Sequence, residues 1–206
     1  MPVNLNIQAD VIDIRVDTPQ QNDILLVDTN VWFWQTYTNA GFGTNASRFS
    51  NYLNYLNQAL SNRATLSYSG LILAELAHII EKTEYEIYIQ SHGDLPFKEY
   101  RHNYPIERAN VVAKVELAWS QVKALAVPVN LTVDDATTDA ALNRFKSQAV
   151  DGYDLLLLEA ISRAGAGQVK IITADMDYTV VPGIQVFTSN NNVVQEAAIQ
   201  NKLVVR

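Results

Sequence analysis

The stretch Ile24-Leu25-Leu26-Val27-Asp28-Thr29-Asn30 decides the fold of this 206-residue chain. Four aliphatic residues in a row, with no polar interruption, are typical of a strand that is buried on both faces of a parallel sheet. The run stops at Asp28, so an acidic side chain comes directly after the predicted strand. Open parallel sheets carry their functional groups at the carboxyl ends of the strands. Asp28 is therefore the first candidate for a functional side chain.

Outward from this stretch, predicted strands alternate with predicted helices. Short apolar runs predict further strands at 64–68, 127–131, 169–173 and 184–187. Apolar residues at helical spacing predict helices at 46–61, from 70 to a break at 91–96, at 105–125, at 134–148 and at 155–164. Ser69 is expected to cap the second of these helices, and Gly165 to Gly167 to end the last. The alternation predicts an α/β sandwich around a mostly parallel sheet.

The first 23 residues differ from the rest of the chain. Residues 3–16 alternate loosely between apolar and polar, which predicts a strand or hairpin, and a polar turn follows at 18–23. We therefore divide the chain into an N-terminal extension, 1–23, and a main domain, 24–206. The strand could pair with a neighbouring subunit or fold back on its own sheet, since an open strand edge needs a cover.

Composition excludes several classes of protein. The chain has 22 acidic and 15 basic residues, a net charge of −7, so it has no broad basic face for nucleic acid. With no cysteine, it has no disulfide, no thiolate zinc site and no cysteine nucleophile. Its densest apolar stretch, 71–80, contains Glu75 and His78 and is far short of the ~20 residues of a membrane span. We expect a soluble, cytoplasmic protein that does not associate with membranes.

Four acidic residues fall at related places in this pattern. Asp28 and Asp175 follow predicted strands, and Glu75 and Asp154 lie in the first turns of predicted helices. In a parallel sheet all four would lie near one edge, where two carboxylates ~4 Å apart repel by about 4 kcal/mol. Either their pKa values rise or cations hold them together. Ligation by oxygen alone favours the hard ions Mg²⁺ and Mn²⁺.

Each acidic residue also has an ordinary structural interpretation. Asp28 could belong to a simple turn after the strand, and Glu75 could lie on an exposed edge of its helix. Asp151 is better explained as a helix cap than as a site residue. Asp175 and Asp177 could belong to a polar loop. It is the series of four that favours a shared site.

Together these segments resemble the PIN-domain family of metal-dependent nucleases, which includes the VapC-type toxins. The matching segments, in the order of the family, are Leu26-Val27-Asp28-Thr29-Asn30, residues 69–76 (SGLILAEL), residues 154–160 (DLLLLEA) and residues 171–178 (IITADMDY). The resemblance implies a three-layer α/β/α sandwich with about five strands, and cleavage of single-stranded RNA by metal-activated water. It implies that Asp28, Glu75, Asp154 and Asp175 are the catalytic acids and the ligands of Mg²⁺ or Mn²⁺. Thr173, Asp151 and Asp177 would be auxiliary residues.

The resemblance also implies partners. It predicts a homodimer, for which the long segment 82–126 and the N-terminal strand offer surfaces, and an antitoxin protein that holds the nuclease inactive. The alternative is a PIN-like module that binds protein or RNA but has no catalytic activity in isolation.

Two aromatic segments bear on RNA binding. The segment 97–108 mixes basic and aromatic residues, and we expect Lys98 and Arg101 there to contact RNA, unless the segment is a solvated linker or a dimer surface. Trp32, Phe33 and Trp34 follow the first acid and could stack on bases, but packing in the core is the better explanation.

Overall fold

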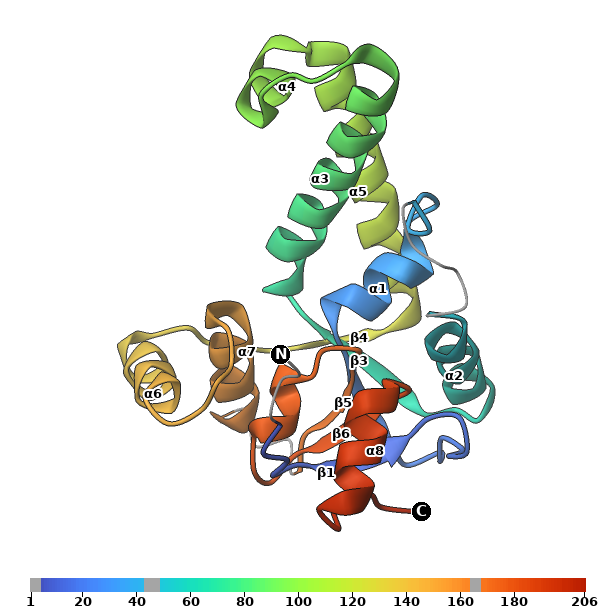
Figure 1. Cartoon of the computed structure of the whole chain (residues 1–206), viewed down its shortest axis with the longest axis vertical. Helices are drawn as coiled ribbons and strands as arrows, with labels where there is room; N and C mark the ends of the chain where they lie inside the picture. The colour runs from blue at the N-terminus through green and yellow to red at the C-terminus, as the bar shows by residue number, and fades with distance from the viewer. Residues whose placement is uncertain (1–4, 43–48, 164–167) are drawn as a thin grey trace.

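The sheet has six strands, all parallel, in a computed structural model that describes residues 5–42, 49–163 and 168–206. Its order is β1-β6-β5-β2-β3-β4 (Figure 1). β2 lies near the middle, and its Leu26 pairs with Ile171 on one side and Ser67 on the other. The strands are β1 (Asp10–Asp13), β2 (Ile24–Val27), β3 (Thr65–Ser69), β4 (Val127–Val129), β5 (Lys170–Ile172) and β6 (Gln185–Thr188).

Helices cover both faces of this sheet and make it the middle of three layers. The predicted α/β/α sandwich is confirmed, with one strand more than expected. One face packs against α1 (Thr29–Thr36), α2 (Ser50–Ser61), α3 (Ile72–His92) and α5 (Pro105–Leu125). The other packs against α6 (Asp135–Phe145), α7 (Gly152–Arg163) and the short 3₁₀ helix η2 (Asp177–Val180). At the sheet edge, α8 (Asn191–Ile199) covers Val11 of β1.

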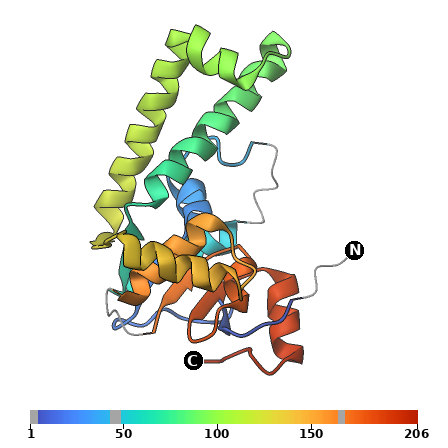
Figure 2. The same cartoon turned by 90° about the vertical axis from the view of Figure 1, so that its left-hand side faces the viewer.

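The helices α3 and α5 form a long hairpin that extends beyond the sheet, with α4 (Phe97–Asn103) at its tip (Figures 1 and 2). A buried carboxylate links the middle of this hairpin to the end of α1: Glu84 pairs with Lys114 at 2.6 Å and accepts a hydrogen bond from the Tyr37 hydroxyl. The tip is held by packed aromatic rings, of Tyr85, Tyr88, Phe97, Tyr100 and Tyr104. These contacts join α1, α3, α4 and α5 into one layer.

The N-terminal segment belongs partly to the main sheet. The strand predicted over 3–16 is limited to β1, which pairs with β6 of its own chain, and the first four residues lie outside the described part. Leu5 and Ile7 pack with Val193 and Ala197 of α8. The domain boundary at residue 23 stays a prediction.

Several local expectations need correction. Ser69 does not cap a helix: it ends β3, and its Oγ accepts a hydrogen bond from the Leu71 amide at 3.1 Å, while α3 begins at Ile72. Three helices, α1, α4 and α8, were not predicted. The expected helical residues 46–48 and the expected stop at 165–167 lie outside the described residues. Among the helices that the structure describes, none combines the length and apolarity that a bilayer crossing requires.

Candidate active site

Asp28 stands at the junction between a strand and a helix. It directly follows β2 and is the N-cap of α1, where its Oδ1 accepts a hydrogen bond from the Thr29 amide at 2.7 Å. Aspartate is among the strongest N-cap residues, so the sequence places the start of α1 at this point. The side chain is 5 % exposed. The fold therefore buries a carboxyl group at the carboxyl edge of a central strand.

Thr173 connects Asp28 to the end of β5. Its Oγ1 donates to Asp28 Oδ2 at 2.6 Å and accepts from the Asp175 amide at 2.9 Å. Asp175 Oδ1 in turn accepts from the Asp177 amide at 2.9 Å. The auxiliary residues Thr173 and Asp177 thus shape the loop that carries Asp175. Because β2 and β5 are paired and parallel, the two loops meet at the same edge.

Glu75 reaches this edge from the first turn of α3. Its Oε2 accepts a hydrogen bond from the Thr29 hydroxyl at 2.6 Å, next to the Asp28 cap. Glu75 also lines a small cavity together with Asp154 and Leu157 of α7. In Figure 1 the lower end of α3 lies between α1 and α7. Glu75 is half-buried, so it is not on a fully exposed edge of its helix.

Asp154 lies in the first turn of α7. Asp151 precedes that helix, and its Oδ1 accepts hydrogen bonds from the amides of Tyr153 at 3.0 Å and Asp154 at 3.1 Å. Asp151 therefore caps the helix, as the sequence indicates. Asp154 is buried, and its Oδ1 accepts a hydrogen bond from the hydroxyl of Tyr178 in η2. The cap thus fixes the helix start that carries Asp154.

This cluster of acidic side chains has no cationic partner among the described residues, and the pKa values of two of its members are raised. Burial raises the pKa of Asp28 to about 7; the hydrogen bond from Thr173 opposes the rise, and repulsion from Glu75 and Asp175 adds to it. Burial likewise raises the pKa of Asp154 to about 8, opposed by the Tyr178 hydrogen bond and assisted by Asp28, Asp151 and Asp175. No Lys, Arg or His of the described ranges forms an ion pair with the four acids. Within the described part of the chain, the side chains that donate hydrogen bonds to these carboxylates are neutral.

The four acids therefore come together into one interacting group at the carboxyl edge, from four different elements. Its donor chemistry, oxygen only and with excess negative charge, fits a hard divalent cation, which Asp28, Glu75, Asp154 and Asp175 could hold. Their side chains do not form a ready-made cage: within the described residues, no three His, Asp or Glu side chains are arranged to hold a metal ion. The four acids fit a divalent cation by their charge and their oxygen donors, and not by a preformed coordination geometry.

Three residues of this cluster were not predicted from the sequence. Thr29 joins Glu75 to the Asp28 cap. Asn30 donates from Nδ2 to Asp28 Oδ2 at 2.6 Å and accepts from the Ala174 amide at 3.4 Å. Tyr178 contacts Asp154. Thr29 and Asn30 are short polar residues directly after the first acid, a signal that was present in the sequence. Tyr178 gave no comparable signal, because tyrosine is ordinary in a core.

The predicted RNA contacts lie elsewhere. Arg101 is at the hairpin tip, where its guanidinium binds Glu81 through two hydrogen bonds of 2.8 and 2.5 Å, and Lys98 is exposed beside it. Figure 1 places α4 at the far end of the hairpin from the sheet. The role of both residues in binding RNA stays a prediction. Trp32 is fully buried and Phe33 is 8 % exposed, so two of the three clustered rings belong to the core.

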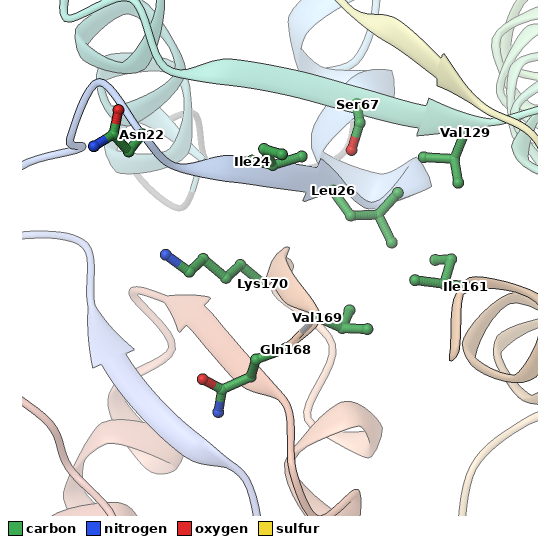
Figure 3. Close-up of a pocket in the computed structure, with 9 residues that line it drawn as sticks. All are labelled: Asn22, Ile24, Leu26, Ser67, Val129, Ile161, Gln168, Val169 and Lys170. Atoms are coloured by element: carbon green, nitrogen blue, oxygen red, sulfur yellow. The ribbon is translucent and has the colours of Figure 1, made fainter. Parts of the chain in front are cut away.

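A second cavity has a volume of about 250 Å³, and Figure 3 shows the residues that line it. Its walls are mostly aliphatic, and Ile24 and Lys170 at the amino ends of β2 and β5 contribute to it. None of the four acids lines it. The group of four acids and this apolar cavity are therefore separate features of the structure.

Comparison with known proteins adds little to this geometry. No protein-family profile matches the chain, and no curated protein matches it. Among solved structures it is similar to VapBC2 from Rickettsia felis bound to a DNA fragment from their promoter, at 15 % identity. The TM-score is 0.43, and the match covers 79 % of this chain and 96 % of the other. At this identity and TM-score, the likeness says nothing about the activity of the chain.

Proposed function

We propose that this chain is a metal-dependent endoribonuclease that cleaves single-stranded RNA by metal-activated water, and that it acts as the toxin of a toxin–antitoxin pair. The observation that carries the proposal is the group of four buried or half-buried carboxyl groups at the carboxyl edge, with which no cationic side chain of the described residues forms an ion pair. Such a group is costly for folding unless a cation binds it. RNA as the substrate follows from the resemblance of the four acidic segments to PIN-domain nucleases.

The roles of the residues follow from their positions. Asp28 and Asp175, at the ends of the paired strands β2 and β5, would be the principal metal ligands. Glu75 and Asp154 would complete the ligand shell and orient the attacking water. Mg²⁺ or Mn²⁺, when bound, would lower the pKa of that water and neutralise the approaching phosphodiester. Thr173 and Asn30 hold the Asp28 carboxylate in place.

The test is cleavage of a mixed single-stranded RNA pool by the pure protein with Mn²⁺. We expect cleavage that EDTA abolishes and that Asp28→Asn and Asp154→Asn each reduce by about 100-fold or more, in line with the several kcal/mol that a metal supplies. Asp139→Asn, an exposed acid on α6, is the matched control and should cleave normally. Cleavage that persists in both site variants would indicate a contaminant. No cleavage by the wild type would favour the binding module.

The proposed partners need a separate measurement. The antitoxin and the homodimer both rest on the family resemblance, and the α3–α5 hairpin is the most projecting surface available for either (Figure 2). Sedimentation at high micromolar concentration should show a dimer. A monomer under these conditions would contradict the homodimer and leave the nuclease proposal intact.

A further inference from the structure

Tyr178 is a buried tyrosine whose hydroxyl reaches the candidate active site. It lies in η2, three residues after Asp175, and is 0 % exposed. Its ring belongs to the apolar cluster between the sheet and α7, which includes Leu158 and Ile171. Phenylalanine would fill the same space without a polar atom. A buried hydroxyl is unfavourable unless it is hydrogen-bonded, and this one donates to Asp154 Oδ1.

Because of this contact, the two carboxyl oxygens of Asp154 have different surroundings. Oδ1 is bound to Tyr178, whereas Oδ2 accepts no hydrogen bond from the residues that the structure describes. Asp154 also lines the small cavity that it shares with Glu75. The hydroxyl therefore fixes the carboxyl group from the core side and leaves its second oxygen without a protein donor. A neutral donor achieves this without adding a positive charge to the cluster.

We propose that Tyr178 is a positioning residue, which orients Asp154 so that its second carboxyl oxygen is available to a divalent metal ion. The inference rests on the proposed function, because it concerns the same site. It goes beyond that function because it makes the metal affinity of the site depend on Tyr178, a core residue that is not itself a metal ligand. Groups that hold metal ligands in place commonly change metal affinity or activity by about 10- to 100-fold when removed.

Tyr178→Phe tests this role, because it removes the hydroxyl and keeps the ring. The matched control is Tyr55→Phe: Tyr55 is 1 % exposed, and its hydroxyl donates to Asp17 Oδ2 at 2.5 Å, outside the acid group. For each protein, the Mn²⁺ concentration for half-maximal thermal stabilisation and for half-maximal RNA cleavage is measured. A purely structural role would lower the metal-free Tm in both variants and leave these two concentrations unchanged.

We expect Tyr178→Phe to raise both Mn²⁺ concentrations by about 10-fold or more, and Tyr55→Phe to leave both unchanged. Saturating Mn²⁺ should restore most of the kcat of Tyr178→Phe. If wild type binds Mn²⁺ and cleaves RNA, and Tyr178→Phe does so at the same Mn²⁺ concentrations, the positioning role is overturned while the nuclease proposal stands. If wild type binds Mn²⁺ without cleaving RNA, the nuclease proposal fails, and a shifted binding midpoint in Tyr178→Phe still supports the positioning role. If Mn²⁺ does not stabilise the wild type, both are overturned.

Discussion

The two ends of strand β2 each carry a buried aspartate, and they are treated in opposite ways. Asp23 precedes the strand and is 2 % exposed; Asp28 follows it and is 5 % exposed. Asp23 Oδ1 binds the Lys170 ammonium at 2.7 Å and the Arg206 guanidinium at 2.8 Å. Asp28 accepts its hydrogen bonds from neutral groups of Thr29, Asn30 and Thr173, among the residues that the structure describes.

The difference appears directly in their acidities. Burial would raise the pKa of Asp23, but hydrogen bonds from Arg206 and Lys170 bring it down to about 2. Burial raises the pKa of Asp28 to about 7, because neighbouring Glu75 and Asp175 add repulsion that the Thr173 hydrogen bond does not offset. The same strand thus shows a carboxylate that serves the fold at one end. At the other end it shows one that no cation of the described residues compensates.

We call the amino end of β2 the compensated end, because Asp23 there pairs with cations, and the carboxyl end, with Asp28, the uncompensated end. The largest expected change in stability comes from removing Arg206 at the compensated end. Arg206 pairs with both Asp17 and Asp23, and its guanidinium lies 4.7 Å from the centre of the Phe187 ring. Arg206→Met should lower the free energy of unfolding by about 3–5 kcal/mol, because it removes the cation that Asp17 and Asp23 share and leaves Asp23 with Lys170 alone. Urea denaturation at pH 7 measures the change, with the exposed Lys98→Met as control. A loss below about 1 kcal/mol would show that this network does not stabilise the fold.

The second largest expected effect is on the pH dependence of stability, because the carboxyl groups at the two ends of β2 change stability in different pH ranges. Asp28 and Asp154 have pKa values of about 7 and about 8 in the folded protein, above the usual aspartate pKa of 3.8. Between pH 5 and pH 6 the folded protein keeps these protons and the unfolded chain does not, so stability should fall as pH rises. One such group contributes about 1.4 kcal/mol per pH unit. Asp23 is ionised in both states over that range, and its contribution is lost only as pH falls below 3.8 towards 2.

This prediction is measured by denaturation in EDTA at pH 5 and pH 6. Asp28→Asn removes one of the two groups and should make the dependence on pH shallower, whereas the exposed Asp139→Asn should not. Stability that rises from pH 5 to pH 6 would contradict the view that the carboxyl edge is uncompensated.

The sequence predicted the sheet and the four acids better than their surroundings. The run Ile24-Leu25-Leu26-Val27 predicted a strand that is buried on both faces, and Leu25, Leu26 and Val27 are buried while Ile24, at the amino end, is 58 % exposed. The acid after the strand was therefore expected at the carboxyl edge. Periodicity fails in α1, because apolar residues lie on more than one side of that short helix, and Trp32 and Phe33 are both buried. The helix is recognisable mainly from its Asp28 cap, which had been considered as a simple turn.

Long-range partners were beyond the sequence for a physical reason. The Asp23–Arg206 and Tyr178–Asp154 contacts join residues 183 and 24 positions apart, and no local pattern encodes either pairing. Arg101 is a further example: its charge and aromatic neighbours predicted an RNA contact, which stays a prediction, and did not show that Glu81, on the preceding helix, binds its guanidinium. The sequence shows that residue 101 carries a positive charge, but it does not show which acidic residue pairs with it.

The smallest expected effect is that of Asp28→Asn on the free energy of unfolding, and it measures most directly what the charge of Asp28 costs the metal-free fold. Asp28→Asn, at pH 8 in EDTA, removes one of two repelling buried charges while the amide oxygen can still accept the cap hydrogen bond from the Thr29 amide. We expect the free energy of unfolding to rise by up to about 1 kcal/mol, since the new amide faces the donors Asn30 and Thr173 and part of the gain is lost. Asp28→Ala removes both the charge and the cap, and should fall below Asp28→Asn by about 0.5–2 kcal/mol. Comparing the two variants by urea denaturation separates the capping role of Asp28 from its charge. If Asp28→Asn is destabilised by more than about 1 kcal/mol in EDTA, the carboxylate stabilises the metal-free fold, and the contrast between the two ends of β2 does not hold.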